Sequence, residues 1–169
     1  LVQAIECELA SLSHVERMAM EVAQIVEQID LWIYAAGKIQ SIRSAQMDPN
    51  DWQRILDANL NGVHYSLNAT LPMLAPDAHL FFIGAYIDRL IMPGLAAYAA
   101  SKAALETYTA ILDKELKGRK VTLVRPAAVD TPFWQQVPFK LPSTAITAEQ
   151  VADRIFIAYE QGLKGLLDL

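Results

Sequence analysis

The run Leu31-Trp32-Ile33-Tyr34-Ala35 is short, apolar on both of its faces, and contains aromatic and β-branched side chains. Two later runs, at 79–83 and 121–124, have the same character. Strands with this pattern are buried on both sides, as in a parallel sheet that is covered by helices. Val2–Leu9 is a less regular strand candidate, and Gly165–Leu169 is a candidate for a last strand.

Segments of helical periodicity separate these runs. Helix starts are predicted by three pairs of capping residues, which are Ser13 with Glu16, Asp48 with Pro49, and Thr147 with Gln150. The pattern after Asp48 is helical as far as Leu71, and another helix is predicted from Tyr98 to Lys117, with Gly118 ending it. The order βαβαβαβ-loop-αβ predicts an α/β fold with a doubly wound parallel sheet.

A doubly wound sheet places its ligand site beyond the carboxyl ends of its strands. Those ends are expected at Gly37, at Gly84-Ala85 and at Pro126. The segment Pro126–Pro142 contains four prolines and is expected to be a long loop. Long loops in compact domains are usually functional, so this loop is expected to border the site.

Composition narrows the class of protein. The 169 residues fit one domain of about 100–200 residues. A formal charge of −5 without basic clusters argues against nucleic acid or an anionic membrane as a partner, and no apolar run is long enough for a membrane span. The single Cys7 fits a reducing, cytoplasmic location, and no zinc site or other metal site is expected. Because Leu1 is not Met, the chain is expected to be a piece of a longer one.

Two predicted helices carry polar side chains at positions of the inward face where the other residues are apolar. The inward row of the helix at 98–117 includes Tyr98 and Lys102, which are one turn apart and share a face. An ammonium group beside a phenol is expected to lower the phenol pKa toward neutrality, as a general acid or base requires. Asn59 takes a similar position on the helix after Asp48.

A structural interpretation of the same residues stands beside the catalytic one. A Tyr and a Lys four residues apart occur by chance in many helices, and a Lys can extend its ammonium group out of a half-buried face. An isolated Asn in an apolar stripe more often makes a structural hydrogen bond than it relays a proton.

Four motifs in a fixed order favour the catalytic interpretation. They are Ala35-Ala36-Gly37, Asn59-Leu60-Asn61-Gly62, Tyr98-Ala99-Ala100-Ser101-Lys102, and the run 125–132, Arg-Pro-Ala-Ala-Val-Asp-Thr-Pro. These resemble, in order, the NNAG turn, the helix motif with the catalytic Asn, the YxxxK segment and the RPGxVxTP loop of the short-chain dehydrogenases/reductases. The resemblance covers nearly the whole chain from Val2 onward and implies a Rossmann-like fold.

The resemblance also implies roles. Tyr98 would donate a proton to a carbonyl or accept one from an alcohol. Lys102 would lower the pKa of Tyr98 and hold the nicotinamide ribose, and Asn59 would fix a water that links Lys102 to solvent. The cofactor would be NAD or NADP. The cofactor-binding residues would be Glu8, Ala36, Gly37, Tyr98, Lys102, Pro126, Val129 and Thr131, and the substrate pocket would include Ala85, Tyr86 and Phe133, beneath a substrate loop at about 126–146.

The sequence departs from the family pattern in three places. No Gly-rich phosphate-binding turn occurs, and Val2 corresponds to the family's third strand, so two strands and two helices would be absent. The position of the family's catalytic serine is Ala85, with Tyr86 as the nearby substitute for its hydroxyl. Ala35 and Ala127 replace a usual Asn and Gly.

Two functions follow from these observations. The leading one is an NAD(P)-dependent oxidoreductase that acts on a small carbonyl or alcohol substrate, because Tyr98, Lys102 and Asn59 are all present. The alternative is a catalytically impaired binding or regulatory protein of the same fold, favoured by Ala85 and by the missing phosphate-binding turn. The resemblance further implies a homodimer or homotetramer that pairs through the helices at 48–71 and 98–117 and hides outer apolar residues such as Leu67.

Overall fold

A computed structural model describes residues 2–169; Leu1 lies outside the described residues. Its main sheet is parallel, as the sequence predicts, and has four strands in the order β1-β2-β3-β6. The strands are β1 (Ile29–Tyr34), β2 (Leu74–Ile83), β3 (Lys120–Arg125) and β6 (Gly165–Asp168). The register aligns Tyr34 with Phe82 and Phe82 with Leu123, so the carboxyl ends of β1, β2 and β3 meet at one edge.

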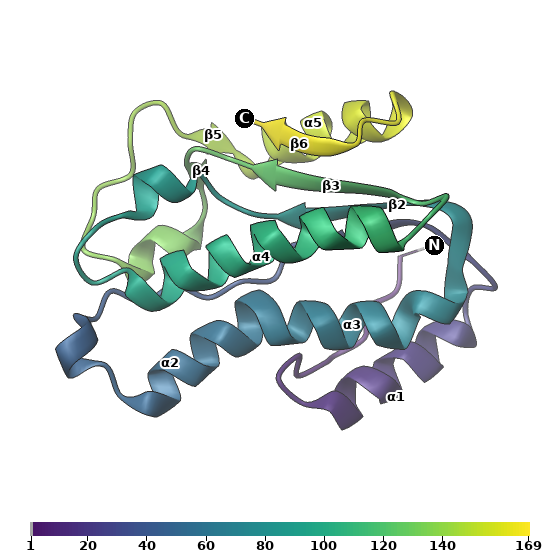
Figure 1. Cartoon of the computed structure of the whole chain (residues 1–169), viewed down its shortest axis with the longest axis horizontal. Coiled ribbons are helices and arrows are strands. Elements are labelled where there is room, and N and C mark those ends of the chain that lie inside the picture. The colour runs from purple at the N-terminus through teal and green to yellow at the C-terminus, as the bar shows by residue number, and fades with distance from the viewer. Residues whose placement is uncertain (1) are drawn as a thin grey trace.

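Helices cover both faces of this sheet. In Figure 1, α4 lies just below and in front of β2, α2 and α3 run below α4, α1 lies beside α3, and α5 lies behind β6. The bounds are α1 (Leu12–Ala23), α2 (Pro49–Leu56), α3 (Gly62–Thr70), α4 (Ala96–Glu115) and α5 (Ala148–Glu160). None of the helices within residues 2–169 combines the length and the apolar character that a membrane span needs.

Strand side chains alternate between two apolar cores. Leu80 and Phe82 point into the core beneath α3 and α4, whereas Phe81, between them, packs against α5. All three side chains are fully buried. This two-sided burial explains why the predicted strands are apolar without alternation.

Local capping agrees with the sequence at two helices. Asp48 caps α2 by accepting a hydrogen bond from the Asn50 backbone N–H at 2.8 Å, and Thr147 and Gln150 form a capping box at α5. The predicted capping box at Ser13 and Glu16 is wrong. Helix α1 begins at Leu12, so Ser13 lies in its first turn, where its hydroxyl contacts that of Ser11 at 3.1 Å.

Three other predictions are corrected. Val2–Leu9 forms no strand, because within residues 2–169 no strand lies beside it to exchange backbone hydrogen bonds. The predicted helix from Asp48 to Leu71 is interrupted by a π-helical turn at Asp57–Asn61. Leu67 is not an outer residue, because it lies in the core with 2% of its surface exposed.

The long loop after β3 contains short ordered elements. A two-stranded parallel ladder joins β4 (Val129–Asp130) to β5 (Ile146–Thr147), and a 3-10 helix covers Pro132–Gln136. The ladder anchors both ends of the loop beside the carboxyl end of β3. The 3-10 helix then carries Phe133 toward the start of α4, where it packs against Tyr98.

Candidate active site

Tyr98 lies in the first turn of α4 and is buried, with 8% of its surface exposed. Its ring packs with Ile39 and Leu95 in a small apolar cluster, and the ring of Phe133 covers it at a centroid distance of 5.8 Å. Burial raises the pKa of Tyr98 to about 12. The phenol is therefore protonated at neutral pH.

Lys102 lies one turn further along α4 and is also buried. Its Nζ donates a hydrogen bond to the Ile83 carbonyl at the end of β2, at 2.7 Å, and lies 5.8 Å from the centroid of the Tyr98 ring. Burial lowers the pKa of Lys102 to about 8.

The shared face of Tyr98 and Lys102 is thus as predicted, but the predicted effect on the Tyr98 pKa is not found. Desolvation disfavours the phenolate and is the cause of the upward shift. The ammonium group is engaged with the Ile83 carbonyl rather than with the phenol oxygen.

Asn59 occupies the middle of the π-helical turn and is fully buried. Its Oδ1 accepts a hydrogen bond from the Lys38 N–H at 2.8 Å, and its Nδ2 donates to the Lys38 carbonyl at 2.9 Å. The same Nδ2 donates to Ser101 Oγ at 2.8 Å, and the Ser101 hydroxyl donates to the Tyr98 carbonyl at 2.7 Å. Asn59 therefore ties the loop after β1 to the catalytic candidates on α4.

The π-helical turn has its own support from β1. Tyr34 donates a hydrogen bond from its hydroxyl to the Ala58 carbonyl at 2.8 Å. A Cβ on Gly62 would lie 2.7 Å from that hydroxyl, so only glycine leaves room for it. Extra backbone inserted at a π-helical turn is frequent at functional sites, and here it carries Asn59.

Ala85 and Tyr86 follow the end of β2, where the sequence places the substrate pocket. Ala85 is buried and brings no hydroxyl. The ring of Tyr86 is contacted by two guanidinium groups, with Arg89 at 4.7 Å and Arg125 at 5.3 Å from its centroid. Arg125 is itself fixed by two hydrogen bonds to the Asp168 carboxylate, at 2.7 and 3.0 Å.

The loop residues expected at the cofactor lie beyond β3. Pro126 follows directly on that strand, and Val129 accepts a hydrogen bond from Trp134 Nε1 on its carbonyl at 2.9 Å. The Thr131 hydroxyl donates to the same carbonyl at 3.5 Å. These contacts hold the start of the loop in a defined shape.

Gly37 and Glu8 differ in their relation to the site. A Cβ on Gly37 would lie 3.2 Å from Asn59 Oδ1 and 3.9 Å from Lys102 Nζ, so Gly37 belongs to the same group of residues. Its neighbour Ala36 is exposed. Glu8 is exposed and accepts a hydrogen bond from the Ala10 N–H at 3.1 Å. The next residue, Leu9, lies against Gly62 at the start of α3, so Glu8 is not among the residues that contact Asn59 and Lys102.

Two members of the site were not identified from the sequence. Ser101 lies inside the quoted Tyr98–Lys102 segment, three residues after Tyr98, and that spacing on one helical face was the available signal. The backbone of Lys38 could not have been found, because its contact with Asn59 depends on the π-helical turn.

Both the sequence and the fold of this chain have relatives among known proteins. A family model described as "Enoyl-(Acyl carrier protein) reductase" matches residues 2–160. An uncharacterized oxidoreductase of Staphylococcus saprophyticus is 32% identical over 140 residues, which is 76% of this chain and 58% of the relative. Another from Staphylococcus epidermidis is 28% identical over 163 residues, 94% of this chain and 70% of the relative. The chain thus spans between about half and three quarters of these proteins.

Solved structures share the fold. A short-chain dehydrogenase/reductase from Serratia marcescens superposes with a TM-score of 0.87 at 19% identity, covering 99% of this chain and 75% of that one. A short chain dehydrogenase from Burkholderia cenocepacia, solved in complex with NADP, has a TM-score of 0.86 at 21% identity and covers 98% and 74% of the two chains.

Proposed function

The chain belongs to the short-chain dehydrogenase/reductase family, and on that premise we propose that the complete protein is an NAD(P)-dependent oxidoreductase that interconverts a small carbonyl compound and its alcohol. The observation that carries the proposal is the pair Tyr98 and Lys102, buried one turn apart at the carboxyl edge of the sheet. Burying an ammonium group and a phenol hydroxyl costs free energy, and a catalytic role is one reason for a protein to retain such a pair.

The proton step is assigned to Tyr98. Its raised pKa keeps the hydroxyl protonated at neutral pH, which is the state that donates a proton to a carbonyl oxygen. In the reverse direction the phenolate oxygen accepts the proton of the alcohol. Lys102 would stabilise the phenolate only through its positive charge, since its ammonium group lies 5.8 Å from the ring centroid and hydrogen-bonds to the Ile83 carbonyl. Asn59 and Ser101 position the backbone of this helical turn.

The residues around Gly37 fit the nicotinamide end of the cofactor. The bare backbone of Gly37 leaves space next to Asn59 and Lys102 that a Cβ would fill. Lys102 and Tyr98 would hold the ribose hydroxyls there, and Pro126, Val129 and Thr131 would contact the nicotinamide and the phosphates. Glu8 and Ala36 would lie toward the adenine. The bound cofactor would supply or accept the hydride.

Binding and turnover by the complete protein test this proposal. We expect NADH or NADPH fluorescence to change on titration with the protein, and the cofactor to be oxidised in the presence of at least one member of a carbonyl panel. Binding without turnover would favour the alternative, a binding or regulatory protein of the same fold, for which the absent hydroxyl at Ala85 is the supporting observation. An unchanged nicotinamide signal would refute the oxidoreductase function.

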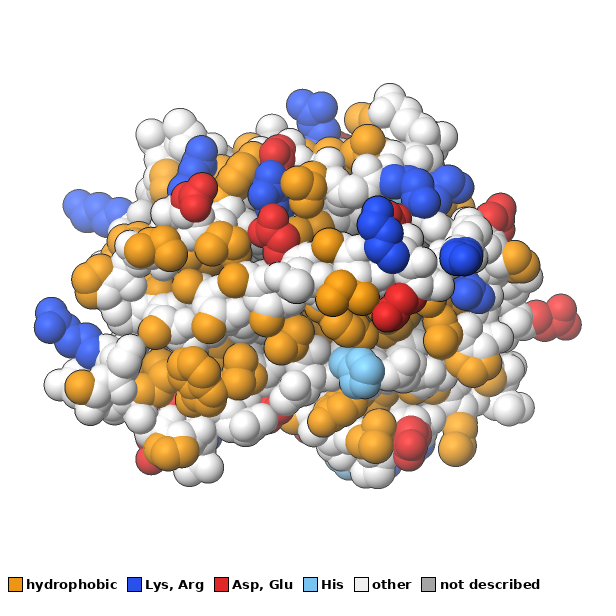
Figure 2. Space-filling view, viewed as in Figure 1, with side chains coloured by type: hydrophobic (Ala, Val, Ile, Leu, Met, Phe, Trp, Pro, Cys, Tyr) orange, Lys and Arg blue, Asp and Glu red, His pale blue; other side chains and the backbone are white. Residues whose placement is uncertain are grey.

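We also propose that the protein is a homodimer or homotetramer that pairs through α2, α3 and α4. Hydrophobic side chains lie along these helices on the face viewed in Figure 2, with a His between them. Trp52 on α2 and Ile111 on α4 are large and exposed. Sedimentation of the complete protein as a monomer at micromolar concentration would contradict this.

The single free Cys7 supports a cytoplasmic location.

A further inference from the structure

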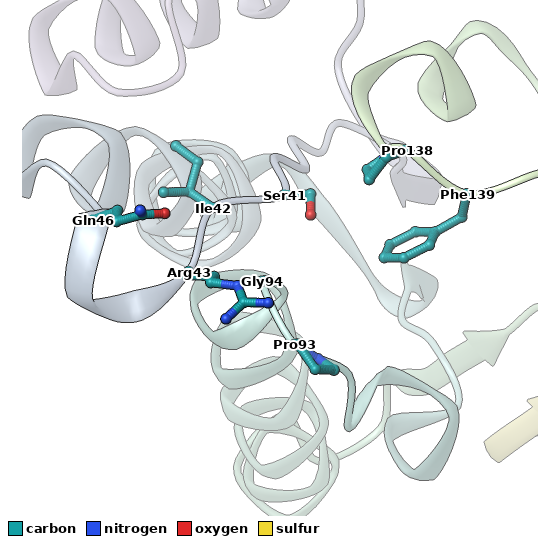
Figure 3. A pocket seen from close by; sticks show the side chains of 8 residues that line it. All are labelled: Ser41, Ile42, Arg43, Gln46, Pro93, Gly94, Pro138 and Phe139. Carbon is teal, nitrogen blue, oxygen red and sulfur yellow. The ribbon is translucent and has the colours of Figure 1, made fainter.

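A cavity of about 410 Å³ opens beside the Tyr98 cluster. Three segments that are far apart in the sequence form it: the loop after β1 at Ser41–Gln46, the turn at Pro93–Gly94 before α4, and the substrate loop at Pro138–Phe139. Figure 3 shows the Ser41 hydroxyl and the Arg43 guanidinium group near Gly94, with the ring of Phe139 across the cavity from Gln46. The cavity is open to solvent, and its volume is large enough for part of a small molecule.

The charge on the lining of the cavity is positive. Arg43 is the charged side chain among the residues that line the cavity, and no Asp or Glu lines it. Within residues 2–169 the Arg43 guanidinium group forms no ion pair with a carboxylate. Ser41 and Gln46 add a hydroxyl and an amide that can donate hydrogen bonds. This set of donors suits an anionic oxygen group, which a guanidinium group binds through paired hydrogen bonds.

The backbone on one side of the cavity is held rigidly. The Ile42 N–H donates to the Gly94 carbonyl at 3.0 Å, which joins two of the three segments. Gly94 has a φ of +87°, and a Cβ there would lie 2.7 Å from Ser41 Oγ, so the close approach of these segments requires glycine.

Phe139 connects the cavity to the proton donor. It lines the cavity and also packs in the cluster that contains Tyr98 and Leu95, the residue next to Gly94. From Leu95 to Tyr98 the helix advances by only about 5 Å along its axis, given a rise of about 1.5 Å per residue. A small molecule bound with one end in the cavity is thus close to Tyr98 along the fold, and it would reach the phenol by displacing the Phe133 ring.

We propose that the cavity binds a carboxylate or phosphate group of the substrate, so that the complete protein acts on carbonyl compounds or alcohols that carry an anionic group. Arg43 determines this specificity, and Ser41 and Gln46 assist it. The proposal rests on the proposed oxidoreductase function for the reaction itself, whereas binding of the anion depends on the cavity alone.

The test compares acids with their neutral esters in the complete protein. A series of straight-chain oxo-acids of increasing length, their methyl esters, and the corresponding oxoalkyl phosphates serve as substrates. We expect kcat/KM for the favoured acid to exceed that for its ester by about 10- to 100-fold, as for a hydrogen-bonded charge pair. Comparison of the carboxylate and phosphate series identifies which anion is preferred.

Two variants locate the effect. Arg43→Met is expected to remove the preference for the acid and to leave kcat/KM for the ester within about threefold of the parent, a change of under 1 kcal/mol. Arg154→Met is the matched control, because Arg154 is exposed on α5 and does not line the cavity. Equal turnover of acid and ester by the parent, or equal loss of both in Arg43→Met, would overturn the proposal.

Ligand-induced thermal stabilisation separates this proposal from the oxidoreductase function. The probes are straight-chain alkanoic acids and alkyl phosphates, which match the substrates but lack the oxo group. We expect them to raise the Tm of the parent, of Arg154→Met and of Tyr98→Phe, but not that of Arg43→Met. If no carbonyl is turned over and this pattern is still observed, the oxidoreductase function fails and the anion site stands. If no analogue raises the Tm of the parent, the anion site fails whatever the turnover.

Discussion

Asn59 and Ser101 are joined by a hydrogen bond of 2.8 Å between Asn59 Nδ2 and Ser101 Oγ, and both side chains are fully buried. This bond connects the π-helical turn to α4 between Tyr98 and Lys102. The candidate catalytic residues on α4 are therefore held by an amide from the π-helical turn.

Ser101→Ala should cost stability more than activity. The change leaves one N–H of Asn59 without its buried acceptor, so the free energy of unfolding should fall by about 1–3 kcal/mol in denaturant titrations. Turnover should fall by no more than about tenfold, a barrier change near 1.4 kcal/mol, because Asn59 keeps both hydrogen bonds to Lys38. A larger loss of turnover at unchanged stability would contradict this purely positioning role.

Tyr98→Phe in the complete protein should lower turnover by about 10²–10⁴-fold, because it removes the proton donor. Stability should be nearly unchanged, since the Tyr98 hydroxyl forms no hydrogen bond to another group in residues 2–169 and the packing against Phe133 remains. Tyr108→Phe, on the same helix, is the control: it breaks a hydrogen bond to His64 and should leave turnover intact. Turnover by Tyr98→Phe within about tenfold of the parent would remove Tyr98 from its role.

Ala85→Ser should raise turnover. The new hydroxyl would lie at the position of the family's serine, and a donor to the reacting oxygen is worth about 10²–10³ in rate. The gain should be smaller than this if the Tyr86 hydroxyl already supplies part of the effect. Steady-state rates with saturating cofactor measure it, and an unchanged rate would mean that a hydroxyl here does not reach the reacting oxygen.

Tyr86→Phe isolates the hydroxyl of Tyr86, because phenylalanine keeps the ring that Arg89 and Arg125 contact. We expect it to reduce turnover in the parent and to have little effect in the Ala85→Ser background. A double-mutant cycle reads this coupling. Additive effects in the cycle would show that the two hydroxyls do not share one task.

His79 should make stability depend on pH. The Thr122 hydroxyl donates its proton to the Leu163 carbonyl, so Thr122 Oγ1 accepts a hydrogen bond from the His79 Nε2–H at 2.8 Å. Within residues 2–169 the buried Nδ1 of His79 has no hydrogen-bond partner. Burial lowers the pKa of His79 to about 4, so between about pH 6.5 and 4 the unfolded chain binds the extra proton.

The free energy of unfolding should accordingly fall as the pH is lowered through this range, by roughly 3 kcal/mol in total from His79. Above pH 6.5 the contribution should not change. Urea denaturation of the parent and of His79→Gln between pH 7 and 4 checks this, since glutamine can donate to Thr122 and does not titrate. Parallel pH dependences in the two proteins would contradict the prediction.

Local periodicity predicted much of this structure from the sequence. The spacing of Tyr98 and Lys102 on one face follows from the helix itself, and the apolar strands follow from burial on both sides. The absence of a strand at Val2–Leu9 could not be predicted, because strand formation depends on a neighbour rather than on the segment. The partners of Asn59 depend on the π-helical turn, which has no pattern in a single sequence. The cavity at Arg43 is assembled from three distant loops, none of which carries a motif of its own.

The ring of Phe133 packs against the ring of Tyr98, so a side chain of the same chain covers part of the candidate proton donor. A molecule that needs this face of the Tyr98 ring has to displace Phe133, which belongs to a loop that the β4-β5 ladder holds at both ends. The displacement of Phe133 therefore precedes the chemical step and contributes to the choice of substrate. We expect a compound whose apolar part can replace the contacts of the Phe133 ring to displace it more easily than a compound that offers only a carbonyl group.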